Sequence, residues 1–174
     1  MIIAIDGHIN SGKTLLGVMF SYYAKIKKNS YIVTNVNSLT FKDKYIKNIT
    51  DMPEIPENFK TGILFIDEIA QLIDSRTSSS KINRLSSYFY LQSRKYRYDF
   101  IFTAQNYGDV DIRLRKIVDI RFRTNFIWKY NDKSYLKYYI LYNSADLNFK
   151  PDEKTILIPD IIFKSYNTME KIIK

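Results

Sequence analysis

The stretch GHINSGKT, residues 7–14, decides how this chain folds. It matches the pattern glycine, four unrestricted residues, glycine, lysine and then serine or threonine, which is typical of phosphate-binding P-loops. A short apolar run, MIIAID, precedes it, and TLLGVMFSYYAKIKK follows with one apolar helical face. A P-loop requires this context of a buried strand before it and a helix after it. The sequence therefore predicts a nucleoside triphosphate site at the first turn of the chain.

Each position of the loop has an expected part in that site. Gly7 and Gly12 free the backbone, so that its N–H groups converge on phosphate oxygens at the start of the helix. Lys13 is expected to reach the β- and γ-phosphates and to act in catalysis, and Thr14 to bind Mg²⁺, the cofactor of ATP. The predicted nucleotide-binding residues are Gly7, His8, Ile9, Asn10, Ser11, Gly12, Lys13 and Thr14.

Further along the chain, apolar runs alternate with helical patterns, which predicts an α/β fold with a mainly parallel central sheet flanked by helices. More clearly alternating segments near the C-terminus suggest an antiparallel extension at the sheet edge. Expected strands are Ile2–Asp6, Ser30–Val36, Gly62–Asp67, Asp99–Gln105, Ile120–Trp128, Tyr135–Tyr142 and Thr155–Ile158, the last with a hairpin partner near Ile161–Tyr166. Expected helices are Thr14–Lys28, Lys81–Tyr96 and, as a short helix or turn, Val110–Val118, whereas 76–80 suggests a loop and 38–60 predicts no element.

Polar residues stand where two of the apolar strands end, the edge at which such sheets bind ligands. Asp67 and Glu68 follow GILFI, and we expect Asp67 to hold Mg²⁺, directly or through water, and Glu68 to polarise the attacking water as a general base. Gln105 follows DFIFTA, and its amide is expected to bind the attacking water or the γ-phosphate and to signal phosphate loss.

The formal charge of the chain is +9, and seven of its eight arginines lie between Arg84 and Arg123. Such a block attracts phosphate polymers, and arginine favours forked phosphate contacts. One arginine of an oligomeric ATPase typically reaches a neighbour's γ-phosphate, and we expect Arg94 or Arg113 to do so. The other arginines either contact DNA or pair with acids of the chain itself, alternatives that spacing does not separate.

Length and composition indicate one globular domain, 1–174, with an ATPase core, 1–128, and a C-terminal strand extension and tail, 129–174. There is no cysteine, which excludes disulfides and thiolate metal sites. No run approaches 18 apolar residues, so we expect no integral membrane segment.

Beyond these patterns, the chain resembles a known group of motor proteins. The segments LFIDEIAQLIDSR (64–76), LQSRKYRYDFIFTAQNYGDVDIRLRKIVDIRFRTNF (91–126) and IIFKSYNTMEKI (161–172) are similar to the FtsK–HerA superfamily of P-loop ATPases. Within it they look closest to the zonula occludens toxin-like branch and to viral genome-packaging ATPases. The resemblance implies a RecA/ASCE-like P-loop NTPase fold.

The resemblance also implies a function and partners. It suggests a ring of identical subunits, a hexamer or pentamer, that pumps double-stranded DNA in the cytoplasm of the host cell and docks on a capsid or portal protein. An alternative is a zonula occludens toxin-like ATPase for virion assembly or export, acting on protein at a membrane. A further alternative is a nucleotide switch or small-molecule kinase, against which stands the absence of an N-K-x-D motif and of a clear arginine-rich lid.

Overall fold

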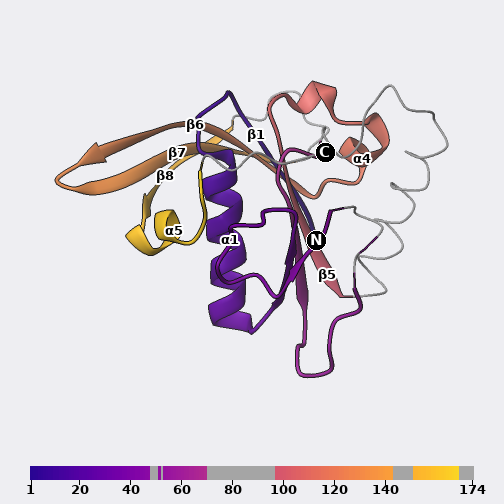
Figure 1. Ribbon diagram of the computed structural model, residues 1–174. Coiled ribbons are helices and arrows are strands. Elements are labelled where there is room, and N and C mark those ends of the chain that lie inside the picture. The colour runs from indigo at the N-terminus through magenta and orange to yellow at the C-terminus, as the bar shows by residue number, and fades with distance from the viewer. Residues whose placement is uncertain (48–50, 52, 70–96, 143–150, 169–174) are drawn as a thin grey trace.

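The computed structural model describes residues 1–47, 51, 53–69, 97–142 and 151–168 (Figure 1). These residues build one sheet of eight strands in the order β3-β2-β4-β5-β1-β6-β7-β8. The strands are β1 (Ile2–Asp6), β2 (Tyr31–Thr34), β3 (Lys44–Tyr45), β4 (Gly62–Ile66), β5 (Tyr98–Ala104), β6 (Ile120–Tyr130), β7 (Lys133–Tyr142) and β8 (Asp152–Ile158). The helices are α1 (Lys13–Lys28), α4 (Ile112–Lys116), α5 (Asp160–Lys164) and the short 3-10 helix η2 (Tyr107–Asp109).

The first six strands of this order, from β3 to β6, are parallel, and β6, β7 and β8 form an antiparallel extension. Strand β5 lies between β1, which leads into the P-loop, and β4, which ends in the two acids. This inserted strand is the mark of the expected RecA/ASCE-like arrangement. The carboxyl ends of β1, β4 and β5 consequently meet at one edge of the sheet, as ligand sites of parallel sheets require.

Both faces of the central strands are buried, which explains why β1 and β4 are apolar without alternation. Side chains such as Ile3 and Ile5 pack with α1 and α5 on one face, while Ile2 and Ala4 pack with η2, α4 and their neighbours on the other. Figure 1 shows α1 and α5 side by side on the same face of the sheet, with α4 on the opposite side. Helix α1 thus starts at the P-loop and runs back along the sheet, fixing the direction of the loop.

One expectation about the C-terminal part was confirmed in part, and another was wrong. Strand β6 belongs to the antiparallel extension through its pairing with β7, as expected, but it also pairs in parallel with β1. Its apolar–polar alternation reflects one covered and one open face, and alternation carries no information on strand direction. The segment near Ile161–Tyr166 forms helix α5 instead of a hairpin partner, because Pro159 starts a helix whose buried residue Ile162 packs into the core on the α1 face.

The remaining expectations concern smaller elements. Strand β3, within the region for which no element was expected, has only two residues and pairs with β2. The short helix within Val110–Val118 is confirmed as α4. The loop expected at 76–80 and the helix expected at Lys81–Tyr96 lie outside the described residues. In the described part of the chain, no helix combines the length and the apolar character that crossing a membrane requires.

Candidate functional site

The P-loop forms a tight turn between β1 and α1 that only its glycines permit. Gly12 has φ 94°, a left-handed conformation, and a Cβ atom on it would lie 2.8 Å from Leu136 Cδ1. A Cβ atom on Gly7 would lie 2.5 Å from Thr124 Oγ1, so β6 closes directly against the start of the loop. Asn10, at φ 62°, is one of the few residue types that tolerate this region. The loop is therefore held from behind by β6 and β7, with no room for larger residues.

Hydrogen bonds anchor the loop to β6. The hydroxyl groups of Ser11 and Thr124 lie 2.7 Å apart, and Thr124 also donates to the carbonyl oxygen of Asp6 at 3.3 Å. His8 and Ile9, in contrast, are exposed at the tip, with Ile9 71% accessible. The end of the loop near α1 is thus anchored to β6, whereas its tip is exposed to solvent.

Lys13 is folded back over the loop. Its Nζ donates a hydrogen bond to the carbonyl oxygen of His8 at 2.9 Å, and the side chain is largely buried. The ammonium group therefore lies within the arch of backbone that phosphates would occupy, where a phosphate oxygen is a stronger, charged acceptor than a carbonyl. This position suits the predicted contact of Lys13 with the β- and γ-phosphates.

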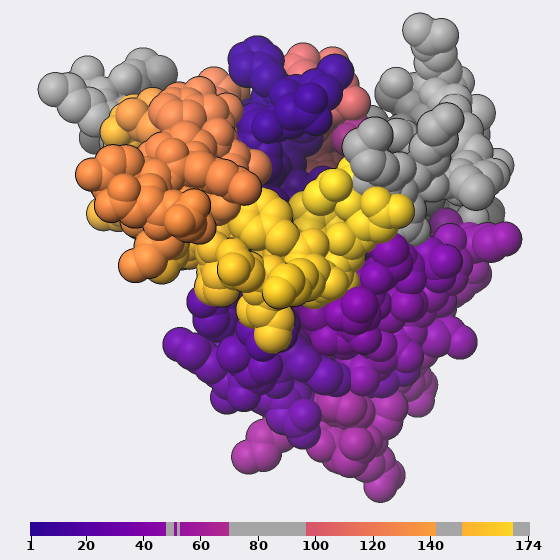
Figure 2. Space-filling view, turned by 60° about the vertical axis from the view of Figure 1, so that its left-hand side comes forward, coloured from indigo at the N-terminus to yellow at the C-terminus, as the bar shows by residue number. Residues whose placement is uncertain are grey.

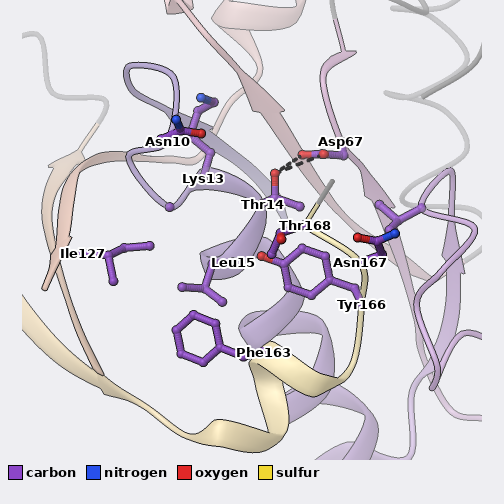
Figure 3. A pocket seen from close by; sticks show the side chains of 12 residues that line it. Asn10, Lys13, Thr14, Leu15, Asp67, Ile127, Phe163, Tyr166, Asn167 and Thr168 are labelled. Carbon is purple, nitrogen blue, oxygen red and sulfur yellow. Dashed lines mark hydrogen bonds between the residues drawn. The ribbon is translucent and has the colours of Figure 1, made fainter. Parts of the chain in front are cut away.

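Asp67 is brought to the P-loop by β4, as the sequence predicted. The hydroxyl of Thr14 donates to both carboxylate oxygens of Asp67, at 2.9 and 3.1 Å (Figure 3). A second hydroxyl, that of Thr103 on β5, donates to Asp67 Oδ1 at 2.7 Å and accepts from the backbone N–H of Glu68 at 2.8 Å. Three elements that are distant in the sequence thus converge on one carboxylate.

The side chain of Asn35 fixes the backbone on which this carboxylate stands. Its amide accepts from Asp67 N and donates to Asp67 O, both at 2.8 Å, so it pairs with both polar groups of the residue. Neither Asn35 nor Thr103 was predicted as a site residue. The available signals were that Asn35 is a polar side chain near the end of the expected strand Ser30–Val36 and that Thr103 is the one polar side chain within FIFTA.

The oxygen donors at Thr14 and Asp67 fit a magnesium ion. Mg²⁺ prefers oxygen ligands and usually keeps several waters, binding proteins through one or two side chains plus substrate phosphates. One hydroxyl and one carboxylate in mutual hydrogen-bond distance, at the foot of a phosphate-binding loop, are that kind of donor set. Thr14 and Asp67 are thus the residues that would hold the metal.

Glu68 and Gln105 meet at the ends of β4 and β5. Gln105 lies close enough to Glu68 for both its side chain and its backbone to act on the pKa of that carboxyl group. Burial raises the pKa of Glu68, as does the neighbouring charge of Asp67, while Lys13 and Gln105 act in the opposite direction. A carboxylate with a raised pKa is a better proton acceptor at neutral pH. Glu68 also has φ 53°, a left-handed conformation that is uncommon outside glycine and aims its side chain away from the regular strand direction.

The described arginines of the basic block mostly pair with acids of the chain itself. Arg121 binds buried Asp6 with two hydrogen bonds, of 2.7 and 2.8 Å, and Arg123 adds a third of 3.1 Å. Arg113, an expected partner of a neighbouring subunit's nucleotide, binds Asp111 at the start of its own helix α4. Arg94 lies outside the described residues. The structure thus brings Lys13, Thr14, Asp67, Glu68 and Gln105 together, whereas Arg113 lies on α4 and is 37% exposed.

Comparison with protein families settles the relationship of the chain. The model of the family described as Zonular occludens toxin (Zot) matches residues 1–167. The chain belongs to the Zot family. No curated protein sequence matches it.

Solved structures agree with the fold. The N-terminal domain of zonular occludens toxin from Neisseria meningitidis is similar over 95% of this chain and 98% of that one, with 19% identity and a TM-score of 0.64. The flagellar accessory protein FlaH from Methanocaldococcus jannaschii matches 81% of this chain and 77% of its own, with 15% identity and a TM-score of 0.55. B204, the DNA-packaging ATPase from Sulfolobus Turreted Icosahedral Virus, matches 75% of this chain and 77% of its own, with 19% identity and a TM-score of 0.49. With TM-scores above 0.5, the first two similarities agree with the P-loop NTPase fold that the sequence indicated.

The raised pKa of Glu68 leads to a prediction on stability. Because the folded chain opposes ionisation of Glu68, it binds that proton more tightly than the unfolded chain does, whose ordinary glutamate pKa is 4.5. The wild-type chain therefore loses folding stability as the pH rises from the pKa of Glu68 in the unfolded chain to its higher pKa in the folded chain. Glu68→Gln removes this loss, so the variant should have the larger free energy of unfolding at neutral pH. The difference from wild type should shrink once the pH falls below the ordinary glutamate pKa.

Urea unfolding of wild type and Glu68→Gln from about pH 4 to about pH 8 measures this difference. Glu57→Gln, at an exposed position, is the matched control and should follow wild type throughout. A difference between Glu68→Gln and wild type that does not change with pH would contradict the assigned electrostatics.

Proposed function

We propose that the chain hydrolyses ATP with Mg²⁺ bound between Thr14 and Asp67 and with Glu68 as the general base. The observation that carries the proposal is the meeting of the Thr14–Asp67 pair and the Glu68–Gln105 pair at one edge of the sheet. In this mechanism the N–H groups of the P-loop and Lys13 hold the phosphates. Mg²⁺, when bound, would neutralise the charge that develops on them.

In this mechanism Glu68 and Gln105 activate and orient the attacking water. The carboxylate of Glu68 accepts a proton from a water aligned with the γ-phosphate, and its raised pKa matches that task. Gln105, which lies close to Glu68, either orients the same water or contacts the γ-phosphate. Loss of the phosphate would change the contacts of Gln105, which directly follows β5 and is separated from η2 by Asn106 alone.

Measurements of ATP binding and of ATP hydrolysis distinguish the role of Lys13 from that of Glu68. Lys13→Ala should abolish ATP binding, because the cation that faces the phosphates is lost. Glu68→Gln should keep ATP affinity near that of wild type and lower the hydrolysis rate by about 10²-fold or more, the usual contribution of a general base. Calorimetric titration with ATP and a phosphate-release assay measure the two quantities, with exposed Lys28→Ala and Glu57→Gln as controls. Hydrolysis by Glu68→Gln at the wild-type rate would show that another group activates the water.

We further propose that hydrolysis drives a ring of these subunits along double-stranded DNA, as in viral genome packaging. The support is the net charge of +9, with exposed lysines such as Lys129 and Lys133 at the turn between β6 and β7. Phosphate contacts of this kind carry no sequence information and therefore suit a protein that slides. An arginine from a neighbour, Arg113 or Arg94, would complete the nucleotide site in the ring.

A second candidate is an ATPase that moves protein during virion assembly or export at a membrane. The observation in its favour is the family match itself, which extends from residue 1 to residue 167. In addition, Arg113, Arg121 and Arg123 are held by acids of the chain, which removes part of the charge argument for DNA.

Hydrolysis by the full chain with and without double-stranded DNA distinguishes the two. A DNA motor should be stimulated several-fold at low salt, and the stimulation should fade as salt rises, because bound counterions compete with the phosphate contacts. Lys129→Glu combined with Lys133→Glu should reduce the stimulation and leave basal hydrolysis unchanged. Hydrolysis that DNA does not alter at any salt concentration would favour the assembly ATPase.

A further inference from the structure

A cavity of about 300 Å³ lies in front of the N-terminus of α1 and has two walls from opposite ends of the chain. One wall consists of P-loop and α1 residues, with Asp67 at its edge. The other wall comes from the end of α5 and the residues after it, namely Phe163, Tyr166, Asn167 and Thr168. Figure 3 shows these side chains facing Thr14 and Leu15 across the cavity. Such a volume lies at the lower end of the range of small-molecule sites.

The chemistry of the lining changes along the cavity. Lys13, Thr14 and Asp67 mark its polar end, where the proposed phosphates and magnesium bind. On the side away from Asp67, the lining is apolar and aromatic, with Leu15, Ile127 and Phe163 (Figure 3). A nucleotide bound by its phosphates at the polar end can place its nucleoside against this side. Aromatic and aliphatic side chains are suitable partners for a base, which stacks on them through its π-face.

From this juxtaposition we infer that the segment Phe163–Thr168 is the nucleoside-binding wall of the ATP site, with Phe163 against the base and Tyr166 beside the ribose and phosphates. The inference rests on the proposed binding of ATP. It adds a role for the C-terminal segment, which is separated by about 150 residues from the P-loop it faces.

The wall is held in place by hydrogen bonds to the segment that follows β2. Thr40 N donates to Ser165 O at 2.8 Å, and Asn167 N donates to Ser38 Oγ at 2.9 Å. Ile162 of α5 is fully buried in the same core cluster as α1. Figure 2 shows the C-terminal atoms, in yellow, lying between the orange β6–β7 hairpin and the purple segment after β2, below the indigo P-loop. The wall is therefore packed on both sides, and its position is fixed before any ligand binds.

Tyr166 lines the same cavity as Thr14 and Asp67 (Figure 3). Its phenol hydroxyl is able to donate a hydrogen bond to an oxygen of the ribose or of a phosphate. Tyr166→Phe removes only this hydroxyl, whereas Tyr166→Ala also removes the ring.

Titration calorimetry of the full chain with Mg²⁺ and either ATP or inorganic tripolyphosphate tests the inference. Phe163→Ala and Tyr166→Ala should weaken ATP binding at least about fivefold, the lower limit of what stacking on one aromatic ring contributes. The affinity of Phe163→Ala for tripolyphosphate, which has no nucleoside, should equal that of wild type. Ile161→Ala is the matched control, because Ile161 belongs to the same helix and is 50% exposed. Photolabelling of wild type with 8-azido-ATP provides a test without any substitution and should mark the peptide that contains 159–168.

The outcomes separate the inference from the proposed function. If wild type binds neither ligand, the proposed function fails. If Lys13→Ala loses ATP while Phe163→Ala and Tyr166→Ala bind it like wild type, or if the azido label appears only elsewhere, the nucleoside wall is wrong and the ATP site stands. Tighter ATP binding or faster hydrolysis in the two alanine variants would also overturn the inference, because the segment would then obstruct the site.

Discussion

The hydrogen bonds around the Asp67 carboxylate are the constraint on which the rest of the site depends. Thr14 at the start of α1 and Thr103 on β5 both donate to it, and Asn35 after β2 pairs with its backbone. A half-buried carboxylate is stable only when such partners replace water. The same bonds therefore stabilise the acid and set the distance between the P-loop and the end of β4. This distance would determine how a nucleotide at this edge of the sheet lies relative to Asp67 and Glu68.

Strand β6 and the C-terminal segment extend this arrangement to the other side of the loop. Thr124 of β6 binds Ser11 and Asp6 O, while Arg121 neutralises the Asp6 carboxylate on the opposite face of the sheet. The same strand contributes Ile127 to the cavity that the C-terminal segment closes. The antiparallel extension is thus a part of the candidate site, since the strand that starts it also supports the P-loop.

Most of the site could be predicted from the sequence, because its key residues each follow a buried apolar strand. The P-loop, Asp67, Glu68 and Gln105 all obey this rule, and parallel pairing places such strand ends together. Asn35 and Thr103 were missed since their importance depends on the register that sets them beside Asp67, 32 and 36 residues away. The direction of β6 and the helical state of α5 depended on tertiary packing, which short amphipathic runs do not encode.

Binding of Mn²⁺, which replaces Mg²⁺ and is visible by electron paramagnetic resonance, tests directly whether Asp67 holds the metal. The chain with a non-hydrolysable ATP analogue should bind Mn²⁺ in a ternary complex. Asp67→Asn keeps the size of the side chain but removes its charge, and it should weaken Mn²⁺ in that complex by about tenfold or more. Exposed Asp132→Asn is the control and should bind like wild type. Equal Mn²⁺ affinity in wild type and Asp67→Asn would contradict the metal site and the P-loop mechanism built on it.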